Sequence, residues 1–409
     1  STMDWENYFG ENVGNTRFAG MVWSDKSVYK EESNELPGIT RTDENNFLVS
    51  LSAIASNLAI TGHTTAPTDT MLVLDLSASM IPTYEVGTIR QQGFGNNYRY
   101  TTVNGRNVSL VQAMVDATNA AIDELMSQNP NNRVGVVLFS GNTSTDDDAT
   151  TSTATVVLPL DRYTGVNKEY LQMNATWQEN VTIYERSGYG PNSSWQSAGT
   201  VDYVATGSSV SVSVKEGLTS GNNAVAVKSK TVEGGTYTQN GLYQALNEFE
   251  KVTDTRVPEG KVQSGADRVP AIVLMTDGAP TIADSDYSGL GTSNTGTGSG
   301  ENEMITFLTQ LTAAYVRGAV SAKYTEEGAA EAQKVLFLTL GLGTRNSTGA
   351  TNTLYPAGTT GNVATAWDTY LSMRNGASRN FSLGGYTRSI TREDAVAEMN
   401  YVDKYYYAD

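Results

Sequence analysis

Met71-Leu72-Val73-Leu74-Asp75-Leu76-Ser77-Ala78-Ser79-Met80 is the stretch of this chain that decides its fold. Four apolar residues that suit a buried parallel strand run directly into one carboxylate and two hydroxyls at alternate positions. In an open α/β sheet, ligands bind in the crevice beyond the carboxyl ends of the strands. Hard oxygen donors at such a place suit Mg²⁺, which takes octahedral oxygen ligation. The stretch therefore predicts a metal-binding edge of an α/β sheet.

Two later segments extend this pattern in the same order along the chain. Residues 234–242, G-G-T-Y-T-Q-N-G-L, are a Gly-rich turn that leads into helical spacing, and residues 271–278, A-I-V-L-M-T-D-G, are a second buried-type strand ending in Asp-Gly. With these three segments the chain resembles the von Willebrand factor type A domain family, over roughly residues 68–385. In that family D-x-S-x-S, the first Thr of G-x-T-x-T and the Asp of T-D-G form the metal-ion-dependent adhesion site. The resemblance implies a metal site made of Asp75, Ser77, Ser79, Thr236 and Asp277.

The resemblance also implies what this site does. The expected ion is Mg²⁺, with Mn²⁺ or Ca²⁺ as alternatives, and the group that joins it is a Glu or Asp carboxylate of a protein partner. Taken singly, each segment has an ordinary explanation, because Ser and Asp cap helices and Asp-Gly makes turns. Five matching positions in sequence order favour the metal site over these structural roles.

The spacing of apolar residues predicts an α/β fold. Strands are expected at 71–75, 133–140, 154–160, 271–276 and 334–340, with a last strand near 379–383; helices are expected over 108–126, 301–319 and near 361–374. Strands that alternate with helices indicate a doubly wound, mostly parallel sheet with helices on both faces. The short polar loop between 133–140 and 154–160 suits an antiparallel pair at one edge of the sheet.

Three parts of the chain are expected around this sheet. Residues 1–67 form an N-terminal β-rich flanking segment, residues 68–385 form the von Willebrand A-type domain, and residues 386–409 form a C-terminal helix or tail that packs on the N-terminal segment. The domain carries insertions near 81–105, 170–233 and 279–300, which we expect on the metal face. Residues 170–233 alternate apolar and polar positions, which predicts strands and a β-rich arm beside the metal. A surface excursion without a binding role is the alternative for this arm.

Composition excludes several classes of function. The 27 basic and 44 acidic residues give a net charge of −17, which argues against binding to nucleic acid or to an anionic membrane surface. Cysteine is absent, which excludes disulfides, thiolate catalysis and zinc–thiolate sites. No apolar stretch has transmembrane length, so we expect no direct membrane insertion by these residues.

The sequence argues against an enzyme. His63 is the only histidine and lies in an apparent linker, so Ser-His-Asp chemistry lacks its base. The Gly-x-x-x-x-Gly-Lys-Ser/Thr loop of nucleotide-dependent ATPases is absent as well. We therefore expect a binding protein.

The N-terminal segment and the inserted arms resemble those of Gram-positive surface proteins, in particular pilus tip adhesins. This resemblance implies an extracellular or wall-anchored adhesin, with signal and anchor outside this chain, that binds a host or matrix protein. The alternative is a structural pilus or surface-layer module that docks to other subunits. Such adhesins often contain Lys–Asn isopeptide bonds; Lys26 with Asn380 is the candidate pair, and an ordinary surface lysine is the alternative.

Overall fold

The computed structural model describes residues 22–29, 48–55, 66–95, 97–141, 154–283, 303–342, 348–356, 379–383, 386–390 and 401–408. The chain divides into two compact units, Ser1–Thr65 and Ala66–Asp409. In the first unit, β1 (Val22–Tyr29) and β2 (Leu48–Ala55) pair as antiparallel strands along their whole length. The predicted helix near 361–374, most of the 279–300 insertion and His63 lie outside the described residues, as do the side chains of Lys26 and Asn380.

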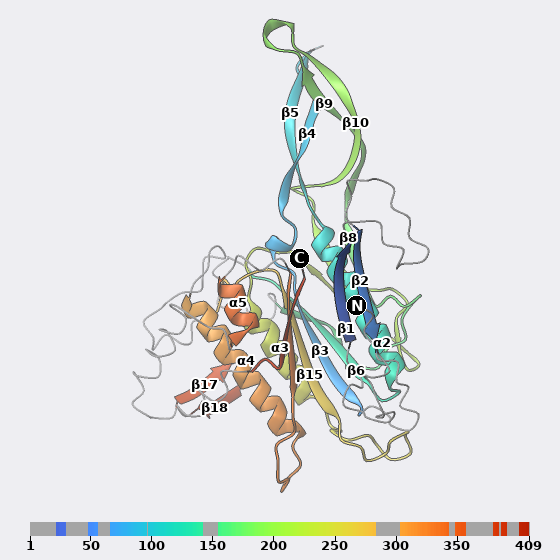
Figure 1. The fold of residues 1–409 in the computed structure, drawn as a ribbon, viewed down its shortest axis with the longest axis vertical. Helices are drawn as coiled ribbons and strands as arrows, with labels where there is room; N and C mark the ends of the chain where they lie inside the picture. The colour runs from blue at the N-terminus through green and yellow to red at the C-terminus, as the bar shows by residue number, and fades with distance from the viewer. Residues whose placement is uncertain are drawn as a thin grey trace. The chain divides into compact units, whose positions relative to one another are not determined.

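The second unit is mixed α/β and contains a six-stranded sheet (Figure 1). The strands are β3 (Thr68–Asp75), β6 (Arg133–Phe139), β7 (Ala154–Asp161), β15 (Val269–Thr276), β16 (Leu336–Leu342) and β19 (Lys404–Ala408), in the order β19-β16-β15-β3-β6-β7. Every neighbouring pair is parallel except β6 and β7, which are antiparallel. The predicted central strands and the antiparallel edge pair are therefore confirmed.

Helices cover both faces of this sheet. The helices are α2 (Ser109–Gln128), α3 (Thr238–Glu250), α4 (Glu303–Tyr324) and α5 (Thr348–Leu354). Side chains of α3 and α4 share one core with Met71 and Val73, whereas those of α2 share the other core with Leu72 and Leu74. Because successive residues of a strand point to opposite faces, β3 supplies side chains to both cores.

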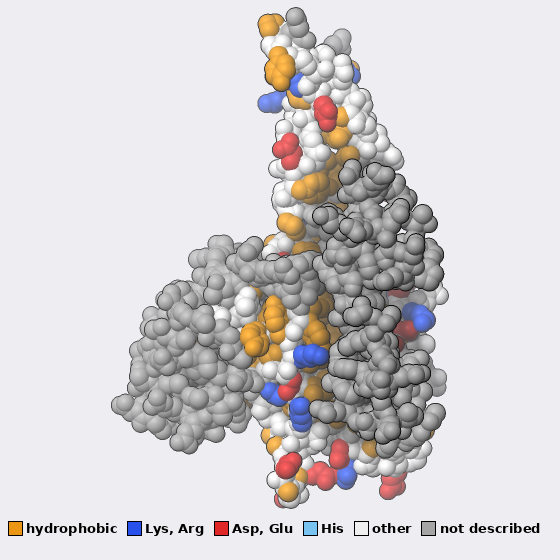
Figure 2. Space-filling view, in the orientation of Figure 1, with side chains coloured by type: hydrophobic (Ala, Val, Ile, Leu, Met, Phe, Trp, Pro, Cys, Tyr) orange, Lys and Arg blue, Asp and Glu red, His pale blue; other side chains and the backbone are white. Residues whose placement is uncertain are grey.

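The insertions near 81–105 and 170–233 build a four-stranded arm. Its strands are β4 (Thr83–Gln92), β5 (Tyr98–Arg106), β9 (Trp177–Ser187) and β10 (Ser194–Ala205), which pair as two antiparallel hairpins. Short pairings of β4 with β9 and of β5 with β10 close them into a barrel. In Figure 2, hydrophobic side chains interrupt the mostly polar surface of the arm.

The rest of the second insertion also forms strands, as its alternation predicts. A three-stranded sheet contains β8 (Leu171–Ala175), β11 (Val210–Val214) and β14 (Ser229–Thr231), and β12 (Thr219–Ser220) pairs with β13 (Asn223–Ala224). Asn119 of α2 ties this sheet to the helix, because its side-chain amide donates to the Leu171 carbonyl and its Oδ1 accepts from the backbone N–H of Leu171 at 2.8 Å.

Two predictions for the C-terminal part are wrong. The strand β17 (Arg379–Leu383) does not finish the main sheet, because it pairs with β18 (Tyr386–Ile390) in a separate two-stranded sheet. The sixth strand is instead β19, in the segment for which a helix or tail was expected. Tyr405 packs against the core while Tyr406 is exposed, so these residues alternate as a strand does, and tyrosine favours strands.

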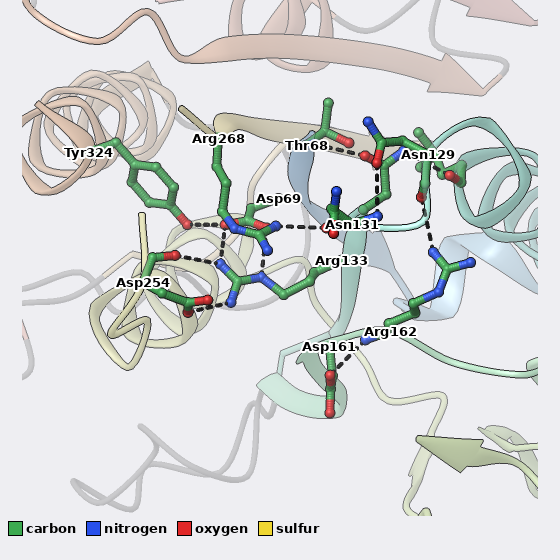
Figure 3. A network of polar contacts seen from close by, with 12 residues as sticks. Thr68, Asp69, Asn129, Asn131, Arg133, Asp161, Arg162, Asp254, Arg268 and Tyr324 are labelled. Atoms are coloured by element: carbon green, nitrogen blue, oxygen red, sulfur yellow. Dashed lines mark hydrogen bonds and ion pairs between the residues drawn. The ribbon is translucent and has the colours of Figure 1, made fainter. Parts of the chain in front are cut away.

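The amino ends of the central strands carry a buried polar network (Figure 3). Asp69 of β3 has no exposed surface and accepts hydrogen bonds from Arg133, Arg268 and Tyr324. Arg133 also donates to Asp254 at 2.8 Å. This network fastens β3, β6 and α4 together at the edge of the sheet opposite the predicted metal site.

None of the helices described is both long and apolar enough to span a membrane.

Candidate metal centre

The candidate centre lies where the strand order of the main sheet reverses. The chain runs from β3 outwards to β6 and β7 on one side, and later from β15 to β16 and β19 on the other. Asp75 is the last residue of β3, and Asp277 directly follows β15, which is the parallel neighbour of β3. Such a reversal opens a crevice at the carboxyl ends of the two strands, where open α/β sheets bind ligands.

Asp75 is fully buried and held by hydrogen bonds on both carboxylate oxygens. The backbone N–H of Ser77 donates to its Oδ1 at 2.7 Å, and the hydroxyl of Thr276 donates to its Oδ2 at 2.5 Å. The first bond turns the chain sharply after β3, so that Ser77 and Ser79 follow on the same edge. The second bond ties the ends of β3 and β15 to each other.

Ser77, Ser79 and Asp277 form a continuous chain of polar contacts. The hydroxyl oxygens of the two serines are 2.9 Å apart, and the Ser79 hydroxyl donates to Asp277 Oδ1 at 2.8 Å. Ser77 is buried, Asp277 is partly exposed and Ser79 is exposed, so the group runs from the interior to the surface.

Thr236 reaches the same place from the turn before α3. Its backbone N–H donates to Thr281 Oγ1 at 2.8 Å, and its carbonyl accepts from the Thr281 N–H at 2.9 Å. A methyl group built on Gly278 would lie 3.6 Å from Ser79 Oγ and 3.9 Å from Thr236 Oγ1, so both hydroxyls border one small space. The structure thus brings all five predicted residues together.

Two glycines allow Thr236 to take this position. Gly235 has a φ of 80°, a left-handed conformation that glycine adopts without steric cost. Gly241 lies against the sheet, where an added Cβ would be 2.7 Å from Phe139 Cδ1 and 3.0 Å from Val73 Cγ1. The missing side chain lets α3 approach β3 and β6 closely, which carries the preceding turn to the carboxyl edge.

The surroundings of the two carboxyl groups disfavour their ionised forms. Burial, and to a smaller extent the nearby charge of Asp277, raise the pKa of Asp75 to about 7. Burial also raises the pKa of Asp277 to about 6. A positive charge between these groups would offset both causes, because it favours their ionised forms.

The donors fit a hard divalent cation. Two carboxylates and three hydroxyls are all oxygen ligands of the kind that Mg²⁺, Mn²⁺ and Ca²⁺ take. Among the residues that the structure describes, no group of three or more His, Cys, Asp or Glu side chains is placed to hold a metal. Any metal at this centre would therefore depend on the three hydroxyls as well as the two carboxylates.

Sequence reasoning missed several supporting residues. Thr276 orients Asp75, and its place at the end of a strand beside Asp277 was a signal for this role. Glu233 forms an isolated parallel bridge with Ser77, and its carboxylate accepts from Ser140 at 3.2 Å and from Lys230 at 3.3 Å. The contacts of Glu233 with Ser77 and Ser140 join segments far apart in the sequence, and no local pattern predicts them.

Comparisons with known proteins add no family assignment. No protein-family model matches the chain, and neither the curated proteins nor the solved structures give a match.

Proposed function

We propose that this chain is an adhesion module that binds a protein partner through a divalent cation, with Mg²⁺ as the expected ion. The observation that carries the proposal is the meeting of Asp75, Ser77, Ser79, Thr236 and Asp277 at one crevice, from three segments that lie far apart in the sequence. A strand-end crevice lined only with oxygen donors suits this ion better than it suits catalysis by side chains.

Each residue has a defined part in the proposal. Asp75 and Asp277 supply the negative charge, while the hydroxyls of Ser77, Ser79 and Thr236 are neutral donors. A bound cation with several neutral ligands would remain electron-poor and would accept a Glu or Asp carboxylate of the partner. Ser79 is exposed, so the partner would approach from its side of the crevice.

The strand order supports a further proposal about the fold. Strands in the order 3-2-1-4-5-6, with helices on both faces, are typical of doubly wound sheets. We assign the described part of 68–385, completed by β19, to a von Willebrand A-type domain on this order and on the motifs. The arm begins three residues after Met80, and the second insertion ends at residue 233, three residues before Thr236. Both insertions therefore adjoin the crevice and would select the partner.

The test measures cation binding and partner binding on matched variants. The wild-type chain is titrated with Mg²⁺ by calorimetry and then applied to a panel of matrix and plasma proteins, in Mg²⁺ and in EDTA. The Asp277→Ala variant should lose both activities. The Asp267→Ala variant removes an exposed carboxylate ten residues earlier and should retain both.

The outcomes separate the adhesin from the alternative. Partner binding that persists in EDTA or in Asp277→Ala would contradict the metal bridge. Self-association that does not depend on metal, without binding to the panel, would favour a structural pilus or surface-layer module.

A further inference from the structure

A second candidate site lies where the arm meets α2. It is a cavity of about 500 Å³, lined by residues of β4, β5, α2, β8, β9 and β10. None of the five candidate metal ligands lines it, so it is separate from the metal centre. Its volume is in the range of about 300–1,000 Å³ that is usual for sites of small molecules.

Two aromatic side chains form walls of this cavity. Tyr84 of β4 is 42% exposed and Trp177 of β9 is 46% exposed, so both rings offer a face to a ligand. The Tyr84 ring rests on the backbone of Gly105, where an added Cβ would lie 3.1 Å from Tyr84 Cε1. Trp177 begins β9 and is paired with Val204 of β10. The contact with Gly105 therefore fixes the Tyr84 ring, and the strand pairing fixes the backbone position from which Trp177 projects.

The polar residues of the cavity are held in place and keep further hydrogen-bonding capacity. Arg106 Nε donates to the Thr206 carbonyl at 2.8 Å, which leaves its two Nη groups as donors. Asp202 Oδ1 accepts from the backbone N–H of Asn180 at 2.7 Å, and its second oxygen remains an acceptor. The side-chain oxygen of Asn107 accepts from the Ser109 N–H at 3.0 Å, and its NH₂ group remains a donor.

The chemistry of the lining indicates the class of ligand. One guanidinium and one carboxylate balance each other, so the lining favours no net charge. Val108 and Met173 add apolar surface without further charge. Aromatic faces carry partial negative charge, which attracts polarised C–H groups, and planar Arg, Asn and Asp groups suit pairs of adjacent hydroxyls. A ring with apolar C–H faces and a rim of hydroxyls meets both requirements.

We propose that this cavity binds a neutral pyranose unit of a glycan. Trp177 and Tyr84 pack against the faces of the sugar ring, while Arg106, Asn107 and Asp202 bind its hydroxyls. This activity is additional to the proposed metal-dependent binding and does not use the cation.

The experiment uses the whole chain and a panel of neutral hexopyranosides and N-acetylhexosamine oligosaccharides. Binding is followed by saturation-transfer NMR and by tryptophan fluorescence, first in EDTA and then in Mg²⁺. At least one neutral sugar should bind with the same Kd in both buffers. The Trp177→Ala and Tyr84→Ala variants should each lower its affinity by about tenfold or more, and Trp177→Phe should retain most of it.

A matched control comes from the same arm. Trp195 of β10 is 37% exposed and does not line the cavity, so Trp195→Ala should leave the affinity unchanged. Thermal denaturation of every variant checks that the arm stays folded. The proposal is overturned if no neutral sugar binds, or if folded Trp177→Ala and Tyr84→Ala bind as the wild type does. Because all arms are run in EDTA, failure of the metal site cannot produce these results.

Discussion

Replacement of Asp75 by asparagine should stabilise the metal-free protein, although it removes a proposed metal ligand. Asp75 is fully buried, and burial together with the charge of Asp277 raises its pKa from 3.8 to about 7. A shift of about 3 units, at about 1.4 kcal/mol each, costs the folded state on the order of 4 kcal/mol when the carboxylate is ionised. Asn has the same shape and no charge, and its carbonyl still accepts from Ser77. We expect Asp75→Asn to raise the free energy of unfolding by about 2–4 kcal/mol at neutral pH in EDTA.

The raised pKa of Asp75 also predicts the direction in which stability changes with pH. The folded-state pKa of Asp75 lies above its unfolded value, so the folded metal-free protein binds this proton more tightly. The contribution of Asp75 to stability should therefore be greatest below about pH 4, fall between about pH 4 and 7, and level off above that. The Asp75→Asn variant lacks this term and retains the smaller decline to about pH 6 that comes from Asp277.

Urea denaturation, followed by fluorescence, measures both effects. Wild type, Asp75→Asn and the exposed-site control Asp267→Asn are compared in EDTA and in millimolar Mg²⁺ at several pH values. Mg²⁺ should stabilise the wild type and the control but leave Asp75→Asn unchanged, because a ligand stabilises only a fold that binds it. A wild type more stable than Asp75→Asn in EDTA at neutral pH would refute the reasoning.

Three further predictions concern the core and the ion. Asp69→Ala should lower the free energy of unfolding by about 3–5 kcal/mol in urea denaturation, because it leaves the buried Arg268 without a carboxylate partner and Arg133 with Asp254 alone. Asp267→Ala should lower it by about 1 kcal/mol at most, and equal losses would contradict this. Gly241→Ala should lower the free energy of unfolding by about 1–3 kcal/mol, because the added methyl group overpacks the core. Gly207→Ala meets open space and should change it by less than about 0.5 kcal/mol; thermal denaturation of both variants measures the difference. Mg²⁺ affinity, measured by calorimetry, should fall by about 30–100-fold between about pH 7 and 5.5, since both raised carboxyl groups must lose protons to bind; a flat profile would argue against them as ligands.

The sequence predicted the central elements of the fold because their signals are local. The apolar run before Asp75 and the helical spacing over 108–126 each specify one element from adjacent residues. That the site residues lie close together could also be predicted, because parallel strands place their carboxyl ends at one edge of the sheet.

What the sequence could not predict depends on pairing over long distances. The strand β19 was not predicted because three consecutive tyrosines show no strong periodicity, and its place is set by its pairing with β16. The closed barrel of the arm likewise needs contacts between β4 and β9, whose residues are about a hundred positions apart. Glu233 acts through Ser77, a residue far from it in the sequence, and no local motif predicts this contact.

The separation of β3 and β15 has a consequence for synthesis of the protein. The hydrogen bond from Thr276 to Asp75 joins residues 201 positions apart, so β3 leaves the ribosome long before its neighbour exists. At about 5–20 residues per second, the wait is about 10–40 s. During this time one edge of β3 exposes backbone N–H and C=O groups that lack their native partner, and an open strand edge can pair with other chains. Production of this protein should therefore be most vulnerable to aggregation while the arm, which is encoded between the two strands, is being made.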